Sequence, residues 1–423
     1  MQEAWGIERN PFPAEAINQG DEPYNPDVFP DELQKLYSRL IYGGAMDRRG
    51  FSFLWSKGAN NEDTGMGKTA MLRQSAKEMN RDFGETVLTE AGINSARLNE
   101  HRAMAAYASF NTTTVTGVYP IFFAAVEFLA DPQTGMDGVS ILDILRDRIR
   151  QENGIEETDS DGLRDAIRHA RRKLGATLPP LREDTIDAYC NSSPGEFADF
   201  LAEVTPTSRI RNGLAYFDFA LTIAAAAGIR HVFVLVDQLE DLATTQTVTK
   251  AKRTREVGRL RDILAEMAPF AGRVHAIFTF HVRASEALEE MWRANRLPSY
   301  DAEDPANENS IVVLRGIQNV EQVRTLLVTY LDKERTDGET GQLLPFEENA
   351  LPILLERSGG RPGILLTEAH KLFDRAADLE RPKIDGLFAA DILGLSGIAR
   401  ARSFRKGATT DSIDARAIDE LLK

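Results

Sequence analysis

The sequence predicts an α/β fold, in which a parallel β-sheet carries helices on both faces and is joined to a helical insertion and a C-terminal helical lid. Apolar runs of strand length recur along the chain with helical patterns between them. Because these runs are apolar throughout, they indicate strands that are buried on both faces, as in parallel sheets. One run leads into a glycine-rich loop, and another ends in a carboxylate. The runs cover residues 51–55, 105–110, 231–236, 274–280 and 311–314.

The chain is expected to divide into three parts. Residues 1–45 are rich in proline and turn residues and contain a helical stretch, which indicates an N-terminal strap and helix. Residues 46–320 would form the core, and within it residues 131–205 are mostly charged and helical, which indicates an insertion. Residues 321–423 would form the helical lid and a C-terminal tail.

A glycine-rich loop follows the first predicted strand and precedes a helix-forming stretch. The backbone N–H groups of such a turn can converge on a polyphosphate, and the positive end of the next helix adds to the attraction. The expected nucleotide is ATP or ADP. We expect Lys68 to reach the β and γ phosphates of ATP, and the Thr69 hydroxyl to bind Mg²⁺. The residues predicted to contact the nucleotide are Thr64, Gly65, Met66, Gly67, Lys68, Thr69 and Ala70.

The loop departs from the usual pattern at one position, because Glu62 stands where the first glycine is expected. Gly58 is the nearest glycine, which indicates that about four additional residues loop out between it and Thr64. A chance glycine-rich turn is the alternative. The strand before the loop and the helix after it favour the phosphate site.

Asp237 ends the apolar run 231–236 and is the predicted partner of Thr69 at the Mg²⁺ ion. Gln238 follows it and can orient a water molecule, but an amide cannot accept the proton. Glu240 is the next carboxylate and the candidate general base. The alternative is a core strand followed by a solvated acidic turn.

Further residues are candidates for sensing the nucleotide. Thr279 and His281 lie at the end of the predicted strand that runs from Val274 to His281 and could report a γ-phosphate, although polar strand ends are common. Arg361 lies between Gly360 and Pro362 at the start of an apolar helix, from which an arginine can fold over a nucleotide. An ordinary helix-initiating turn is the alternative for Arg361.

Short motifs at these positions come in the order expected of AAA+-related P-loop signalling ATPases of the STAND class, which the chain resembles over about residues 5–380. The opening residues 10–13 and Arg361 also resemble the origin-recognition and transposition-regulator branches of AAA+. The resemblance implies a nucleotide-switched protein that forms a homo-oligomer when ATP binds. The expanded phosphate loop departs from the pattern, as does the lack of long effector and repeat domains, so a separate effector or partner protein is expected. The motifs lie at residues 237–240, 279–281, 297–300, 313–316 and 360–362.

Composition narrows the class of protein. The 65 acidic and 50 basic residues give a net charge of −15, which argues against a protein that binds nucleic acid over its whole surface. Cys190 is the only cysteine, which excludes an intrachain disulfide and favours the reducing cytoplasm. No signal peptide or membrane span is evident, so no membrane partner is expected. The scattered histidines and single cysteine do not form a zinc pattern.

One local excess of basic residues could contact DNA. It lies between Lys250 and Asp262 and would form a helix on which Lys252, Arg255 and Arg259 share one face. A solvated face paired with acidic residues is the alternative. The predicted nucleic-acid residues are Lys250, Lys252, Arg253, Arg255 and Arg259.

These observations predict a cytoplasmic, Mg²⁺-dependent ATPase that acts as an ATP-driven switch in a multiprotein system acting on DNA, such as anti-phage defence or transposition control. Two alternatives stay open. One is a STAND-type signalling scaffold that acts on a protein partner. The other is a nucleotide-binding structural subunit with little hydrolysis.

Overall fold

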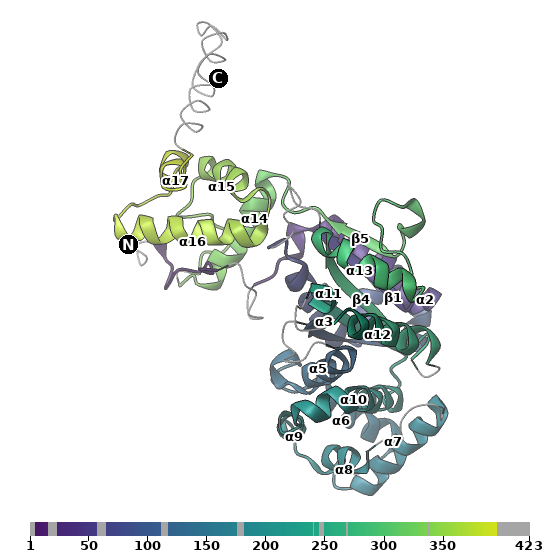
Figure 1. The fold of residues 1–423 in the computed structure, drawn as a ribbon. Helices are drawn as coiled ribbons and strands as arrows, with labels where there is room; N and C mark the ends of the chain where they lie inside the picture. Colours follow the sequence, from purple (N-terminus) through teal and green to yellow (C-terminus); the bar gives the residue numbers. More distant parts are fainter. Residues whose placement is uncertain are drawn as a thin grey trace, which may run out of the picture. The chain divides into compact units, whose positions relative to one another are not determined.

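A computed structural model describes residues 5–15, 23–56, 65–110, 117–175, 182–239, 241–244, 249–267, 270–336 and 338–395 (Figure 1). By their internal contacts the residues form two compact units. The sheet unit comprises Pro30–Lys57 and Lys68–Leu314. The helical unit comprises Met1–Phe29, Gly58–Gly67 and Arg315–Lys423.

The sheet unit is built on a parallel sheet, which confirms the predicted α/β class. The described strands lie in the order β2-β3-β4-β1-β5, and every pairing between neighbours is parallel. Each predicted apolar run coincides with one of these strands, although β2 covers Ala103–Ser109 and the run was predicted over residues 105–110. The strands are β1 (Phe51–Ser56), β2 (Ala103–Ser109), β3 (His231–Asp237), β4 (Val274–His281) and β5 (Ile311–Leu314).

Helices cover both faces of the sheet, as the all-apolar strands predict. Phe53 and Phe278 lie on one face and belong to a large apolar cluster that includes residues of α5, α10 and α13. Leu54 and Phe233 are equally buried, although they point to the other face. There Gly44 of α2 lies so close to the sheet that a Cβ at this position would come within 2.7 Å of the Phe233 ring.

The helices of the sheet unit are α1 (Pro30–Lys35), α2 (Tyr42–Asp47), α3 (Lys68–Arg81), α4 (Glu85–Glu90), α5 (Val118–Ala130), α6 (Ile141–Asn153), α7 (Ser160–Leu174), α8 (Glu183–Asn191), α9 (Glu196–Ala202), α10 (Pro206–Ala226), α11 (Asp241–Thr244), α12 (Lys250–Arg261) and α13 (Val282–Ala294). The 3₁₀- and π-helical segments of this unit are η3 (Leu36–Ile41), η5 (Ser95–Glu100), η7 (Pro132–Thr134), η8 (Asp262–Glu266) and η9 (Pro305–Asn307). Within this unit α5 and α10 pack together, and α6, α7 and α9 pack on these two helices (Figure 1).

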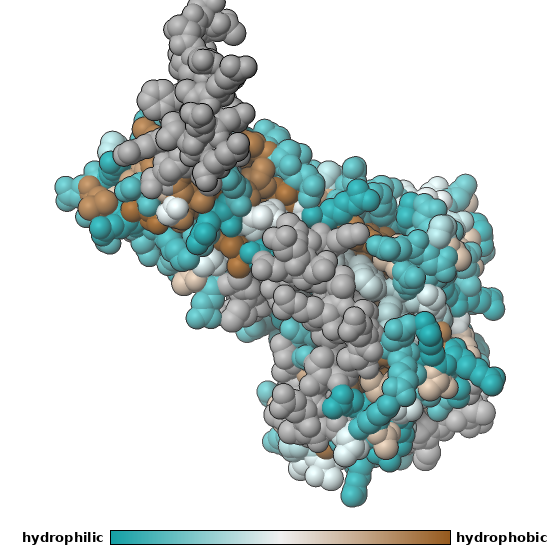
Figure 2. Space-filling model, turned by 45° about the horizontal axis from the view of Figure 1, so that its top comes forward, coloured by the Kyte–Doolittle hydropathy of each residue, from teal (hydrophilic) through white to brown (hydrophobic). Residues whose placement is uncertain are grey.

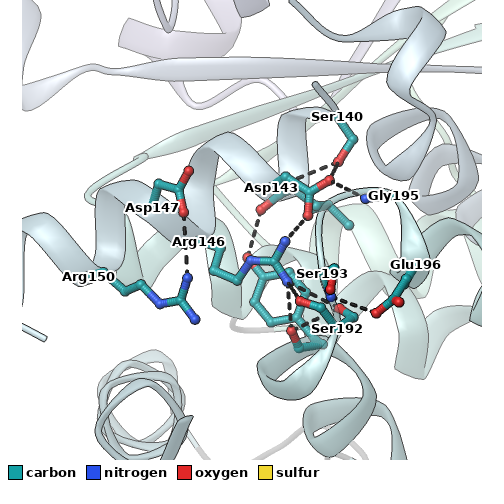
Figure 3. A network of polar contacts seen from close by, with 11 residues as sticks. Ser140, Asp143, Arg146, Asp147, Arg150, Ser192, Ser193, Gly195 and Glu196 are labelled. Carbon is teal, nitrogen blue, oxygen red and sulfur yellow. Dashed lines mark hydrogen bonds and ion pairs between the residues drawn. The ribbon is translucent and has the colours of Figure 1, made fainter. Parts of the chain in front are cut away.

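A buried ion pair ties α6 to the segment between α8 and α9 (Figure 3). The guanidinium of Arg146 pairs with Asp143 and donates to the carbonyl oxygens of Tyr189 at 3.1 Å and Ser192 at 2.6 Å. Asp143 also accepts from the Gly195 N–H at 3.1 Å. Because each charge has both a counter-charge and hydrogen bonds, the pair can remain buried in this layer of helices.

The outer edge of the sheet is closed by a side chain. β2 is an edge strand, so some of its backbone groups have no neighbouring strand to bind. The buried amide of Asn80, near the end of α3, donates to the Ala105 carbonyl oxygen at 2.8 Å and accepts from the Ala105 N–H at 2.8 Å. Asn80 therefore replaces the missing strand at this position and fixes α3 against β2.

In the helical unit, residues 5–15 pack against helices from the far end of the chain. The Trp5 ring lies 4.9 Å from that of Phe373, and its Nε1–H donates to the Pro382 carbonyl oxygen at 2.9 Å. The Phe12 ring lies 5.7 Å from that of Phe346. The helices of this unit are η2 (Pro26–Val28), α14 (Val320–Lys333), η10 (Glu348–Ala350), α15 (Leu351–Ser358), α16 (Pro362–Asp378) and α17 (Gly386–Ile392).

Much of the coloured surface in Figure 2 is hydrophilic. Among the described residues, the large apolar side chains with high exposure are Leu379 and Leu387, both in the helical unit. No helix in the described ranges has the length and apolar character needed to cross a membrane.

We predict that Asn80→Ala lowers the free energy of unfolding by about 2–4 kcal/mol, because the buried N–H and C=O of Ala105 both lose their partner. Urea unfolding measures the change. Gln74→Ala is the matched control, since the Gln74 amide in the same helix binds Glu78 in a less buried position. Equal losses in the two variants would show that Asn80 does not close the sheet edge.

Candidate functional site

The carboxyl ends of the parallel strands bring polar side chains to one edge of the sheet. Ser56 ends β1, Ser109 ends β2 and Asp237 ends β3, and the register pairs Ser109 with Asp237. The helix α3 begins at Lys68. Ligands of open α/β sheets bind at this edge, where the strand order reverses.

Asp237 is the centre of this group of side chains. Its carboxylate is 3% exposed and accepts hydrogen bonds from the hydroxyls of Thr69 and Thr279. The Tyr107 hydroxyl also donates to it, over 3.2 Å. The hydroxyl donors come from α3, β4 and β2, so one buried carboxylate joins three separate elements.

Gln238 is held in an unusual backbone conformation directly after Asp237. Its φ of +60° lies in the left-handed region, which costs free energy for a residue with a Cβ. Its N–H donates to Thr279 Oγ1 at 2.9 Å and to Asp237 Oδ1 at 3.1 Å, and its side-chain Oε1 accepts from the Ser109 hydroxyl at 3.1 Å. These bonds offset the strain and fix the direction of the Gln238 side chain.

Lys68 and Ser56 form the other half of the site. The Lys68 ammonium donates to the Ser56 hydroxyl oxygen over 2.6 Å, and Ser56 is fully buried. This bond holds the lysine side chain at the end of β1. A positive charge in this position, at the first turn of a helix, is suited to an anionic ligand.

The oxygen atoms of Thr69 and Asp237 fit a magnesium ion. Mg²⁺ prefers hard oxygen ligands and is usually held by one or two protein side chains, with water and phosphate oxygens completing the shell. The Thr69 hydroxyl and the Asp237 carboxylate are in direct contact. Over the described ranges, no cluster of three or more His, Cys, Asp or Glu side chains could hold a metal ion by itself. A metal at this site would therefore need the ligand's own oxygens.

Asp241 is a functional candidate that sequence reasoning missed. It lies in α11, and burial, together with the charge of Asp237, raises the pKa of its carboxyl. A raised pKa makes a carboxylate a better proton acceptor. Ser56, Tyr107 and Ser109 were also missed. Their positions at the carboxyl ends of β1 and β2 were the available signal.

Other predicted residues lie partly outside the described part of the chain. Thr64 and Glu240 lie outside the described residues, and so does the side chain of His281. Ala70 is in the first turn of α3. Met66 is buried.

Gly65 and Gly67 group with the helical unit, and both have positive φ, +74° and +89°. Only glycine adopts these values without strain. The Gly65 carbonyl oxygen accepts from the Gly363 N–H at 2.9 Å. The loop is therefore joined to the first turn of α16 within this unit.

Arg361 precedes α16, and its Nε donates to the Ser358 carbonyl oxygen at 3.1 Å. The sensing roles of Arg361, Thr279 and His281 remain predictions. Thr279 itself is fully buried against Asp237 and Gln238, which gives its hydroxyl a positioning role.

The predicted basic helix is α12. Some of its basic side chains form ion pairs, some line a cavity, and Arg259 does both. Lys250 pairs with Glu290 at 2.6 Å, and Arg259 pairs with the buried Glu256 at 2.6 Å. Arg253 lies on the same helix. Lys252, Arg255 and Arg259 line a cavity of about 330 Å³, which Arg211 of α10 also lines.

No protein-family model matches the chain, and no curated protein matches it. Two solved structures of the ORC2 protein from Aeropyrum pernix are similar at 10% identity. The one described as ADPNP-ADP complexes covers 96% of this chain and 81% of its own, with a TM-score of 0.43. The ADP form covers 99% and 82%, with a TM-score of 0.41. Similarity at this level carries no functional conclusion.

We predict that Thr279→Val lowers the free energy of unfolding by about 1.5–3 kcal/mol, because a buried carboxylate and the Gln238 N–H lose the hydroxyl. Thr279→Ser keeps the hydroxyl and is expected to lose much less. Thermal or urea unfolding measures the free energy of unfolding of the two variants. Equal stability of the valine and serine variants would mean that this hydroxyl does not support Asp237.

Proposed function

We propose that this protein binds Mg–ATP at the carboxyl edge of its sheet and uses the nucleotide as a switch. The observation that carries the proposal is the placement of Lys68 and Thr69, in the first turn of α3, against Ser56 and Asp237. An ammonium, a hydroxyl and a carboxylate at the start of one helix are the groups needed to bind a metal-bound polyphosphate.

Each side chain would have a distinct role. Lys68 would exchange the Ser56 oxygen for phosphate oxygens, and Thr69 and Asp237 would hold Mg²⁺. The bound metal ion would neutralise charge on the phosphates. Tyr107 and Thr279 would keep the Asp237 carboxylate oriented through their hydroxyls. The contacts from the backbone of residues 64–67 are proposed from the motif alone.

Hydrolysis of the bound nucleotide requires a group that handles water. Gln238 has a fixed side chain and can orient a water molecule but cannot accept its proton. Asp241, with its raised pKa, and Glu240 are the carboxylates proposed as proton acceptors. Slow turnover would fit a protein in which binding, rather than hydrolysis, sets the state of the switch.

The wider role is proposed on two grounds. The motif resemblance favours assembly into a homo-oligomer when ATP binds, the STAND class and a separate effector protein. The cavity beside α12 favours a contact with DNA, since Arg211 brings a further positive charge to Lys252 and Arg255. We therefore propose a switch within a multiprotein system acting on DNA, of the anti-phage or transposition-control kind.

We predict that Lys68→Ala weakens Mg–ATP binding at least about ten-fold, because it removes a charge-assisted contact to the phosphates. Titration with a fluorescent ATP analogue measures the affinity. Lys77→Ala is the matched control, because Lys77 lies on the exposed side of the same helix. A folded Lys68→Ala variant that binds ATP as the control does would contradict the proposed site.

We predict that Lys252→Glu with Arg255→Glu weakens DNA binding for every DNA sequence, because contacts to phosphates do not read the bases. The slope of log binding constant against log salt concentration is expected to become shallower by about 0.9 for each phosphate contact that is lost. Binding to duplexes of different sequence, over a range of salt concentrations, provides the measurement. The control is Arg172→Glu with Lys173→Glu, which makes the same change in net charge on the exposed end of α7. Equal effects of the two double variants would assign the loss to net charge and not to the α12 cavity.

A further inference from the structure

The amino edge of the sheet, opposite the proposed ATP site, contains a chain of histidines. His231 begins β3, and His275 is the second residue of β4. Nδ1 of His231 lies 3.0 Å from Nε2 of His275, and Nε2 of His231 lies 3.2 Å from Nδ1 of His101. The rings of His101 and His231 are stacked with their centroids 5.4 Å apart.

The hydrogen-bond partners at the two ends of the histidine chain determine which ring nitrogens carry a proton. At one end Nη2 of Arg97 lies 3.2 Å from Nε2 of His101, and an arginine can only donate. At the other end Nδ1 of His275 lies 2.9 Å from the Arg49 carbonyl oxygen, which can only accept. Every ring must therefore accept at Nε2 and donate from Nδ1, so all of them are neutral. Burial agrees with this assignment, since it lowers the pKa of His231 to about 2 and that of His275 to about 4.

The exposed end of the histidine chain lies in a cavity of about 440 Å³. Arg48, Arg97 and Arg230 line this cavity together with His101, and they come from the end of α2, from η5 and from the residue before β3. Glu100 is also part of the lining and provides an opposing charge. The bond to His101 directs one arm of the Arg97 guanidinium and leaves its other N–H groups for a ligand.

These arginines lack the carboxylate partner that many arginines of the sheet unit have. Among the described residues, no carboxylate lies within ion-pair distance of Arg48, Arg97 or Arg230, whereas the adjacent Arg102 pairs with Glu152 at 3.6 Å. The positive charges also act on their surroundings. Burial and Arg230 lower the pKa of Arg273, and burial, Arg97 and Arg230 lower that of His101, against the opposing effect of Glu100. A protein of net charge −15 thus keeps a cluster of arginines that form no ion pair within the described ranges, with Glu100 as the acidic residue of the same lining.

We propose that this cavity binds the phosphate groups of a small anionic ligand through Arg48, Arg97 and Arg230. Planar guanidinium groups bind phosphate oxygens through paired N–H donors, and several around one cavity suit a compact anion with multiple charges. A nucleic-acid strand would instead require positive charges arranged along its path. The histidine chain positions Arg97 by supplying a neutral acceptor that is anchored to the backbone.

This proposal goes beyond the proposed ATP site and uses none of its residues. His231 and Asp237 stand at the two ends of β3, which separates the two edges by about 20 Å at roughly 3.3 Å per residue. A ligand in the arginine cavity therefore does not contact Lys68 or Asp237.

Calorimetric titration with inorganic pyrophosphate, without added metal, tests the proposal. The titrations use the Lys68→Ala background, so that binding at the phosphate loop does not contribute. We expect Arg97→Gln and Arg230→Gln each to weaken pyrophosphate binding about ten-fold or more. Arg102→Gln is the matched control and is expected to have no effect, because Arg102 does not line the cavity and already has an acidic partner.

Chemical footprinting locates the bound ligand independently of affinity. Pyrophosphate is expected to slow the reaction of phenylglyoxal with Arg97 and Arg230 and to leave that of Arg102 unchanged, as read by mass spectrometry. Equal pyrophosphate affinity in all variants would overturn the proposal. Protection by a DNA oligonucleotide, but not by pyrophosphate, would also overturn it. An error in the ATP assignment would be distinguishable, because Lys68→Ala would then leave the wild-type isotherm unchanged while the effects at Arg97 and Arg230 persisted.

Discussion

The buried carboxylate of Asp237 is the constraint on which the proposed site depends. A charge removed from water costs several kcal/mol unless hydrogen bonds replace its hydration. The hydroxyls of Thr69, Tyr107 and Thr279 provide that replacement, and they come from different elements of the sheet unit. The same bonds that stabilise the carboxylate therefore set the position of α3 relative to the strand ends. A further consequence is the left-handed backbone of Gln238, which the Thr279 hydroxyl helps to hold.

The parallel direction of the strands gives the two edges of the sheet different chemistry. At the carboxyl edge, strand ends carry hydroxyls and a carboxylate beside the ammonium of Lys68. At the amino edge, β3 begins with a neutral histidine whose hydrogen-bonded neighbours lead to a group of arginines. One strand thus supplies a residue to each edge. Because the strand is rigid and buried, both residues are held in fixed positions.

Local patterns predicted much of the fold and the chemical centre of the site. Each apolar run coincides with a strand. Asp237, at the end of β3, accepts a hydrogen bond from Thr69, and the motifs had indicated that these two residues lie together. The closure of the sheet edge by Asn80 could not be predicted, because its partner Ala105 is recognised only from the order of the strands. Local patterns also could not predict the packing of residues 5–15 on the C-terminal helices, because this packing joins parts of the chain that are far apart in sequence.

The sequence by itself determined the class of fold, and it identified Lys68, Thr69 and Asp237 as candidate site residues. Both were possible because strand-length apolar runs and a short motif are encoded in neighbouring residues. Tertiary structure alone decided which further groups join them. The hydrogen bonds of Ser56 and Tyr107 follow from the order of the strands, and the raised pKa of Asp241 follows from its burial near Asp237. The arginine cavity arises in the same way, from residues on α2, η5 and the start of β3. The physical reason is that hydrogen bonding, desolvation and charge act through space, whereas a motif records only spacing along the chain.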